Sequence, residues 1–482
     1  MRRIFAATIN HFTLVLSLLA ILMTLTGCST QSSAKPWHRI QLTQEFTTES
    51  LEQNPQRPYR WSDYLAQEEK LFTELANQLA GDDTTAGYRY EPSSPLYTLT
   101  QTPNWNRSFV LTPKTLRAGI VMLHGLTDSP YSVRALALAL QQQGFLVIAP
   151  RIPGHGTLPS GLLDVKWEDW AAATRVAVQE MKRQLGDNPH FYMLGYSNGG
   201  ALAVNYTLEA LEDTDLPLPK KLVLLSPMIG ISNAASFSKP LDSLGHLPLL
   251  SSKRWLSQIP EYNPFKYNSF PVNAGWQAHR ISHHLQKKLA RMAKADQLQQ
   301  FPPVLTFQSL IDSTVKTVAV SEHFYRYLPQ NQSELVIFDL NRHANLAPIT
   351  KPAAINFFDK AFPPEIRAYD FVKISNLNTT TSQVGEFRQR AGSLTTQERA
   401  LDLHYPFGVF SLSHIAIPFP ENDPTFGLQP NTDEFYGIRL GNLHLRGEKN
   451  TIIIKADAGM RLYSNPFYTY MQERIEHWLA VP

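Results

Sequence analysis

The pentapeptide Gly-Tyr-Ser-Asn-Gly at residues 195–199 constrains the fold more than any other part of the chain. It follows an apolar run suited to a buried strand, and the helix-prone residues 201–211 come after it. A Gly-x-Ser-x-Gly turn between a strand and a helix is sharp, and it needs small residues because larger side chains would collide with neighbouring elements. The turn exposes the Ser197 hydroxyl as a nucleophile. It also puts the backbone N–H of Asn198 at the positive end of the new helix, where an oxyanion would be stabilised.

An upstream strand and loop predict the second half of the same site. Residues 117–123 read as a short apolar strand, followed by His-Gly-Leu-Thr-Asp-Ser-Pro at 124–130 and a helix-like stretch at 133–142. In sites built on a serine elbow, a loop of this kind supplies the second backbone N–H of the oxyanion hole. We expect the amide of Leu126 to take this role. His124 is interpreted as a buried turn residue rather than a catalytic base.

A third segment extends the pattern and carries a family resemblance. The apolar strand 145–150 runs into Arg-Ile-Pro-Gly-His-Gly-Thr at 151–157, and Trp-Glu-Asp-Trp follows at 167–170. Together with the loop at 124–130, which is similar to His-Gly-Phe-Thr-Gly-x-Pro, these segments resemble bacterial carboxylesterases and monoacylglycerol lipases of the α/β-hydrolase family. His155 braces the turn in such loops and is therefore interpreted as structural.

The resemblance covers about residues 119–200 and implies the fold class. It departs from the family at Asn198, where Met is common, but only the amide of this residue is needed. The implied class is α/β, with the α/β-hydrolase fold: a mostly parallel central sheet, helices on both faces, a cap inserted after the sixth strand (221–227), and a C-terminal extension. Residues 230–300 are apolar enough for a cap that encloses an acyl chain. The alternative is a packed insertion without substrate contact.

The resemblance also places the acid of a catalytic triad after the seventh strand. That strand reads as residues 302–309, so Asp312 is the expected carboxylate. The alternative is that Asp312 is a turn residue that caps the helix beginning near Val320. The chain order Ser, Asp, His favours the triad role, because this interval must contain an acid.

Two histidines compete for the role of the base. His343 follows an apparent eighth strand and lies 31 residues after Asp312, but it stands in the bulky context Asn-Arg-His-Ala-Asn. His414 lies 102 residues after Asp312 in Ser-Leu-Ser-His-Ile-Ala, which is similar to the family's catalytic histidine segment. We expect His414 to be the base, with residues 345–410 as an insertion that returns the chain to the site.

The N-terminus has the architecture of a lipoprotein signal. A basic start and an apolar run at 12–23 lead to Leu-Thr-Gly-Cys, which resembles the bacterial lipobox and ends at Cys28. We expect removal of residues 1–27 as a signal peptide, lipidation of Cys28, and a flexible tether at 28–60. Ser29 resembles a signal for the outer membrane, so the expected location is the bacterial cell envelope, lipid-anchored and facing the periplasm. The alternative is an uncleaved membrane anchor.

Composition limits the remaining possibilities. The single cysteine leaves no intramolecular disulfide, and a net charge of +3 gives no argument for nucleic-acid binding. No histidine or cysteine spacing typical of a metal site is present. We therefore expect residues 61–482 to form one hydrolase domain that depends on its apolar core for stability.

Two segments of that domain have predicted local structure. Residues 61–81 predict an amphipathic helix with an apolar stripe of Leu65, Phe72, Leu75 and Leu79. In the extension at about 363–464, residues 439–446 and 451–455 predict a β-hairpin.

These features together predict a serine carboxylic-ester hydrolase anchored in the bacterial envelope. Ser197, Asp312 and His414 would form the triad, and the resemblance implies monoacylglycerol, lysophospholipid or a similar acyl ester as the substrate. No cofactor or metal is expected, and the membrane is the expected partner. The alternatives are an acyltransferase that uses the same acyl-enzyme, or a non-catalytic envelope protein on a hydrolase scaffold. The sequence leaves the oligomeric state open.

Overall fold

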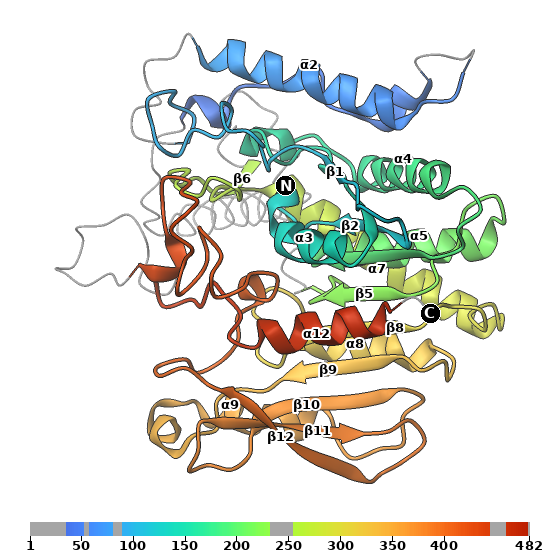
Figure 1. Ribbon diagram of the computed structural model, residues 1–482, viewed down its shortest axis with the longest axis vertical. Helices are drawn as coiled ribbons and strands as arrows, with labels where there is room; N and C mark the ends of the chain where they lie inside the picture. Colours follow the sequence, from blue (N-terminus) through green and yellow to red (C-terminus); the bar gives the residue numbers. More distant parts are fainter. Residues whose placement is uncertain (1–34, 53–56, 81–88, 232–253, 444–458, 481–482) are drawn as a thin grey trace, which may run out of the picture.

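A sheet of ten strands forms the centre of the computed structural model, which describes residues 35–52, 57–80, 89–231, 254–443 and 459–480. The strands lie in the order β1-β3-β2-β4-β5-β8-β9-β10-β11-β12 (Figure 1). Their bounds are β1 (Phe109–Leu111), β2 (Ala118–Leu123), β3 (Phe145–Ala149), β4 (Phe191–Tyr196), β5 (Leu222–Leu225), β8 (Val304–Ser309), β9 (Glu334–Phe338), β10 (Asp370–Asn376), β11 (Gln383–Gln389) and β12 (Thr396–His404).

The middle of the sheet is parallel and its two edges are antiparallel. All neighbours from β3 to β10 pair in parallel, and Val121 of β2, for example, lies between Ile148 of β3 and Met193 of β4. At the edges β1 is antiparallel to β3, β11 to β10, and β12 to β11. Every residue of β2, β3, β4, β5, β8 and β9 is buried, because helices cover both faces. This burial explains why these strands are continuous apolar runs in the sequence.

Helices pack on both faces of the sheet. Ile120 and Met122 of β2 belong to the apolar core that includes α3 and α12, whereas Val121 and Leu123 belong to the core that includes α4, α5 and α7. The protein therefore has the α/β-hydrolase fold expected from the sequence. The helices named here span α3 (Arg134–Gln142), α4 (Trp167–Leu185), α5 (Asn198–Glu212), α7 (Val272–Lys294) and α12 (Tyr468–Trp478).

The segment before residue 61 differs from the flexible tether that the sequence predicts. Residues 35–52 are not a flexible tether, because Trp37 and Phe46 are buried in the apolar cores. The segment contains the 3-10 turns η1 (Pro36–His38) and η2 (Thr48–Glu52). A few aromatic side chains are enough to order it, although its composition is mostly polar. The remainder of the expected tether before residue 35, the signal peptide and Cys28 lie outside the described residues.

The expected amphipathic helix is α2 (Trp61–Leu79), which lies at one end of the molecule (Figure 1). Phe72, Leu75 and Leu79 are buried as predicted, but Leu65 is 37% exposed. The buried face also takes in Tyr64 and Leu71. Positions 64, 68, 71, 72, 75 and 79 share one face at helical spacing, so Leu65 falls one position outside it.

The described part of the expected cap packs into the main body of the fold. Strands β6 (Trp255–Ser257) and β7 (Phe270–Pro271) form a small antiparallel sheet and lead into α7. Ile281 and Leu285 of α7 are fully buried in the main core, so this helix packs as a layer of the fold. Residues 232–253 of the expected cap lie outside the described residues.

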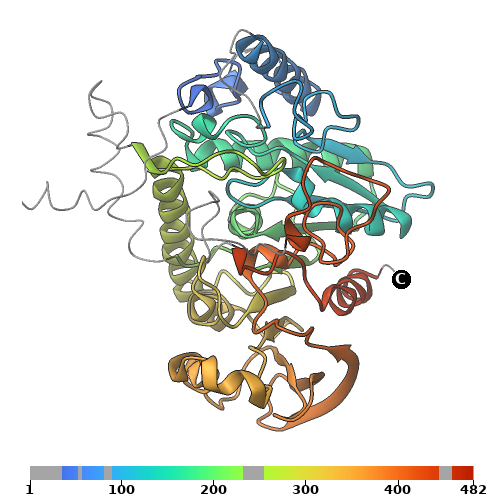
Figure 2. The same ribbon diagram turned by 90° about the vertical axis from the view of Figure 1, so that its left-hand side faces the viewer.

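The long interval before His414 is filled by an extension of the sheet. After β9 the chain forms the short elements η8 (Ala344–Ile349), α9 (Pro352–Ile355) and α10 (Phe357–Ala361), then adds β10, β11 and β12 beyond β9. These strands protrude at the end of the molecule opposite α2 (Figures 1 and 2). Residues 345–410, predicted as an insertion that returns the chain to the site, thus contain this extension of the sheet.

The β-hairpin predicted at residues 439–455 is wrong over residues 439–443, which the structure describes. Its first strand is replaced by the 3-10 turn η10 (Leu440–Asn442), and residues 444–458 lie outside the described ranges. Leu440 is buried among aromatic side chains, so this segment is held by packing rather than by strand pairing. In the ranges that the structure covers, no helix has the length and apolar character to cross a membrane.

Candidate active site

The turn between β4 and α5 holds Ser197 in a backbone conformation that L-residues rarely adopt. Its φ is 53° and its ψ is −113°. A Cβ added at Gly195 would lie 2.3 Å from the Gly199 carbonyl oxygen, and one added at Gly199 would lie 2.1 Å from the Leu123 carbonyl oxygen. Only glycine fits at either position. The small residues predicted on both sides of Ser197 are thus required by the close packing of β2, β4 and α5.

Ser197, His414 and Asp312 form a continuous hydrogen-bonded chain. The Nε2 atom of His414 lies 3.1 Å from Ser197 Oγ, and its Nδ1 atom lies 2.7 Å from Asp312 Oδ2. An ionised carboxylate can only accept, so Nδ1–H donates to Asp312 and Nε2 accepts from the Ser197 hydroxyl. The structure brings together three groups separated by 217 and 102 residues in the chain. This is the geometry of a nucleophile, a base and an orienting acid.

The environment of Asp312 keeps it ionised. Burial alone would raise the pKa of this carboxyl, but the nearby His414 and hydrogen bonds from the Val315 and Thr314 amides outweigh burial and lower the pKa below its ordinary value. Oδ1 accepts from these two amides at 2.9 and 2.7 Å, and the Gln308 side chain donates to Oδ2 at 2.9 Å. The proposed capping role for α8 (Thr317–His323) is not observed, because its N-cap residue is Lys316, without a side-chain cap.

His414 is held in place by three different parts of the fold. It begins the 3-10 turn η9 (His414–Ala416) and is 3% exposed. Ser309 at the end of β8 donates to the carbonyl oxygen of Leu412 at 2.6 Å, and Ser413 donates to the carbonyl oxygen of Leu462. The small residues before His414 allow this close approach of three backbone segments, as their presence in the sequence indicated.

His343, the rival base, lies in another environment. Its Nδ1 atom accepts from the amide of Asn345 at 3.3 Å, and it caps η8. The preceding Arg342 is bound to the buried carboxylate of Asp339, with distances of 2.6 and 3.0 Å. Pairing of β10 with β9 turns the chain away at this point, so the histidine with the family's usual spacing does not reach Ser197.

The two expected oxyanion donors lie on the elbow itself and on the loop after β2. Asn198 is the first residue of α5, and the first amides of a helix have no acceptors within the helix. Leu126 lies in the loop after β2, and this loop is held by a 2.8 Å hydrogen bond from the Tyr267 amide to the Thr127 carbonyl oxygen. The contact of Gly199 with Leu123 brings the elbow against the strand that leads into this loop.

His124 and His155 have structural roles, as their sequence context indicated. Nδ1–H of His124 donates to the Gly125 carbonyl oxygen at 2.9 Å, and its Nε2 accepts from the Ile152 amide at 3.0 Å. His155 is bound to the carbonyl oxygens of Ile152 and Pro153. Burial lowers the pKa of His124 well below its ordinary value and that of His155 to about 3, so both remain neutral braces between loops.

Sequence reasoning missed a group of charged residues around the triad. Asp128 is buried, and its carboxylate pairs with Lys266 at 3.2 Å. Burial raises the pKa of Asp128, against the opposing charges of Lys266, His414 and Arg461. The quoted family loop has Gly where this chain has Asp128, and that difference was the signal available in the sequence. Arg461 had no motif to mark it.

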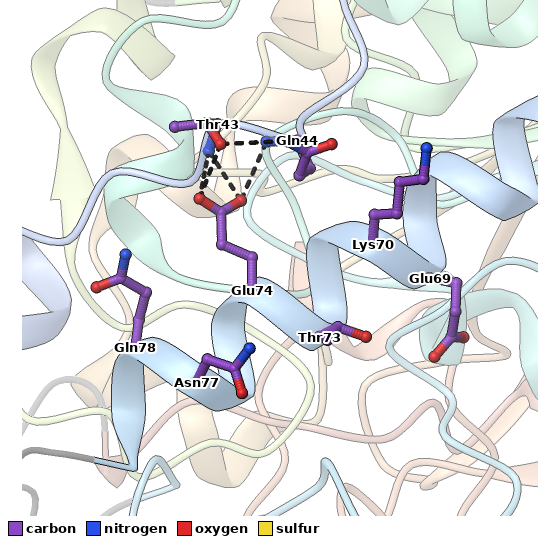
Figure 3. Close-up of a pocket in the computed structure, with 8 residues that line it drawn as sticks. All are labelled: Thr43, Gln44, Glu69, Lys70, Thr73, Glu74, Asn77 and Gln78. Atoms are coloured by element: carbon purple, nitrogen blue, oxygen red, sulfur yellow. Dashed lines mark hydrogen bonds between the residues drawn. The ribbon is translucent and has the colours of Figure 1, made fainter.

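A separate polar depression of about 810 Å³ lies between the N-terminal segment and α2 (Figure 3). Glu74 accepts hydrogen bonds from the amides of Thr43 and Gln44, which attach the segment to the helix. None of the lining residues belongs to the candidate site: Thr43, Gln44, Glu69, Lys70, Thr73, Glu74, Asn77 and Gln78. Within the ranges that the structure describes, no cluster of three His, Cys, Asp or Glu side chains could hold a metal ion.

Comparisons with known proteins agree with this architecture. A family model described as serine aminopeptidase, S33 matches residues 114–347, slightly under half of the chain, which include Ser197 and Asp312 but not His414. The chain is similar to a thermostable monoacylglycerol lipase of Bacillus sp. (strain H-257), with 30% identity over 129 residues, 26% of this chain and 50% of the lipase. It is also similar to a carboxylesterase of Bacillus subtilis (strain 168), with 38% identity over 66 residues, 13% of this chain and 27% of the esterase. The chain thus spans half the length of the first relative and less of the second.

Solved structures of similar fold come from lipolytic enzymes. One, from work on the metagenome-derived lipolytic enzymes LipS and LipT, has 22% identity and a TM-score of 0.38, and covers 49% of this chain and 88% of its own. Another, a soluble variant of a monoglyceride lipase from Saccharomyces cerevisiae with a substrate analogue, has 14% identity and a TM-score of 0.38, and covers 48% and 81%. At these TM-scores the likeness carries no argument, and the fold rests on the strand order and helix layers described above.

Proposed function

We propose that this α/β-hydrolase is a serine carboxylic-ester hydrolase of the esterase and lipase type. The observation that carries the proposal is the hydrogen-bonded chain from Ser197 through His414 to Asp312. The similarity to a monoacylglycerol lipase and a carboxylesterase supports it, and it favours a monoacylglycerol or a similar acyl ester as the substrate. A lysophospholipid, expected from the sequence, is proposed beside them.

The geometry suits a two-step acyl transfer to water. His414 Nε2 takes the proton of the Ser197 hydroxyl while Oγ attacks the ester carbonyl carbon, and the amides of Leu126 and Asn198 stabilise the tetrahedral oxyanion. His414 then gives the proton to the leaving alcohol, which leaves an acyl-enzyme. A water molecule is activated by the same histidine and releases the acid. Asp312 keeps the imidazole in the required tautomer throughout, because its buried carboxylate accepts from Nδ1–H.

We also propose that the enzyme acts at the bacterial cell envelope. The support is the Leu-Thr-Gly-Cys sequence that ends at Cys28 behind an apolar run, as in a lipoprotein signal. A lipid anchor in the outer membrane would hold the hydrolase near acyl esters of the envelope.

The catalytic proposal is tested with alanine variants of the full-length protein. Ser197→Ala and His414→Ala should each lower ester turnover by on the order of a millionfold, because triad members act as a unit. Ser197→Ala should also lose labelling by a fluorophosphonate probe. His343→Ala is the matched control, since it removes the other candidate histidine, and it should keep activity within about twofold by the same reasoning.

The outcomes separate the alternatives. Loss of activity in His343→Ala together with retained activity in His414→Ala would show that His343 is the base. The proposal of a serine hydrolase would then still stand. Full activity in Ser197→Ala would overturn the catalytic proposal, and a native protein without probe labelling would indicate a non-catalytic scaffold. An added alcohol that captures the acyl group in preference to water would identify an acyltransferase.

A further inference from the structure

We propose that Arg461 recognises an anionic group on the alcohol portion of the substrate, so that the preferred ester is a phosphate-bearing one rather than a neutral monoacylglycerol. This inference rests on the proposed ester hydrolysis and names its substrate class. Its basis is a guanidinium that contacts the loop of Asp312 and belongs to the chain segment that supports the loop of His414.

Arg461 is tied to both catalytic loops. Its guanidinium donates to Thr314 Oγ1 at 3.3 Å, two residues after the triad acid. The carbonyl oxygen of the next residue, Leu462, accepts from Ser413, which directly precedes the triad base. The side chain of Arg461 therefore contacts the loop of the acid, and the backbone of the next residue supports the loop of the base.

In the part of the chain that the structure describes, the charge of Arg461 has no carboxylate partner. Among the described residues, no Asp or Glu oxygen lies within 4.0 Å of its guanidinium, whereas Arg134, Arg388 and Arg474 each have such a partner. The side chain is half-buried, and a guanidinium has five donor hydrogens, of which Thr314 accounts for one contact. An anion at this point would gain charge-assisted hydrogen bonds without displacing a carboxylate of the described residues.

The charge of Arg461 also acts on two buried groups beneath the site. Burial raises the pKa of Asp128 in the oxyanion loop, and the charge of Arg461 acts against this rise. Burial also raises the pKa of Tyr196, which precedes the nucleophile, and Arg461 again opposes the rise. The other cation near this loop, Lys266, is already bound to Asp128, so Arg461 is the one with donors to offer.

The mechanism decides which part of the substrate Arg461 meets. His414 must deliver its proton to the leaving oxygen, so the alcohol portion of the ester lies on the side of His414. Arg461 contacts Thr314, and the carbonyl oxygen of its neighbour Leu462 accepts from Ser413, directly before His414, so we infer that its guanidinium lies on that side. The group it binds therefore belongs to the alcohol. A phosphate on glycerol fits, because guanidinium and phosphate match in charge and can form paired hydrogen bonds.

The test compares two esters that differ only in this phosphate: 1-decanoylglycerol and 1-decanoylglycerol 3-phosphate, both kept below the concentration at which they aggregate. The full-length protein should show a kcat/KM at least about tenfold higher for the phosphate, the lower end expected for a hydrogen bond to a charged group. Arg461→Gln should remove this preference by raising KM for the phosphate ester much more than KM for the neutral ester. Arg461→Lys should restore part of it. Arg390→Gln, which removes the same charge from an exposed residue of the sheet extension, is the matched control and should behave as the native protein.

A measurement on the native protein keeps the inference testable if a variant does not fold. The preference for the phosphate should fall as ionic strength rises, because salt screens a partly exposed charge pair. Equal turnover of both esters by the native protein, or an equal loss for both in Arg461→Gln, would overturn the inference. Turnover of simple acyl esters but of neither decanoyl ester would overturn it too. Absence of any ester turnover, together with an unlabelled Ser197, would instead refute the proposed function.

Discussion

The N-terminal segment should contribute to stability through one buried ion-pair cluster. Arg151 is 1% exposed, and its guanidinium contacts both carboxylate oxygens of Glu45, at 3.0 and 2.8 Å, and Glu68 at 3.0 Å. Glu45 comes from the segment before α2, and Glu68 comes from α2 itself. Replacing Glu45 by alanine would leave two donors of a buried guanidinium without acceptors.

The expected magnitude follows from burial. Removing one partner of a buried ion pair costs about 3–5 kcal/mol when the other charge is left buried and unpaired. Here Glu68 still pairs with Arg151, and Glu45 is 16% exposed, so that water can reach part of the vacated site. The expected cost is therefore at most the lower end of this range, about 3 kcal/mol. Glu74→Ala is the matched control. It removes another carboxylate that holds the same segment, but at the exposed contact with Thr43, and should cost no more than about 1 kcal/mol.

Two assays measure the effect. Urea unfolding of the full-length protein gives the loss in free energy of unfolding, and limited proteolysis reports whether residues 35–52 detach before the rest unfolds. Glu45→Ala should shift the unfolding midpoint well below that of Glu74→Ala and expose this segment to cleavage. Equal shifts for the two variants, or an unchanged cleavage pattern in Glu45→Ala, would refute the conclusion that this segment is part of the folded domain.

Two further predictions concern pH and anchoring. Burial raises the pKa of Asp423 from 3.8 to about 6 despite hydrogen bonds from Phe426, Thr425 and Tyr131. The folded protein therefore binds the Asp423 proton more tightly than the unfolded chain does. The contribution of this group to the free energy of unfolding is fully present below pH 3.8, and about 3 kcal/mol of it is lost as the pH rises to about 6. Asp423→Asn should flatten that decline in urea midpoints between pH 4 and 7, and an unchanged pH profile would contradict the assignment. Cys28→Ala should leave the precursor uncleaved and without acyl chains, as judged by mass analysis of the mature N-terminus; a native protein whose N-terminus is not an acylated Cys28 would end the lipoprotein hypothesis.

The sequence by itself determined the elements whose geometry is local. The elbow at Ser197 could be predicted because close packing forbids any side chain at Gly195 and Gly199. The resulting pattern of small residues lies within five consecutive positions of the sequence. The central strands could be predicted because burial on both faces demands continuous apolar runs. Small residues before His414 pointed to a backbone that must approach its neighbours closely.

Tertiary structure decided everything that depends on segments far apart in the chain. His343 has the better spacing from Asp312, and only the pairing of β10 with β9 carries the chain past it and back to Ser197 at His414. The polar composition of residues 35–52 conceals a folded segment, because the partner of Glu45 lies 106 residues away. Arg461 has no motif, since its importance comes from a neighbour 147 residues distant. Steric limits act between adjacent residues and leave a pattern in the sequence, whereas ion pairs and strand pairing join residues whose proximity only the completed fold creates.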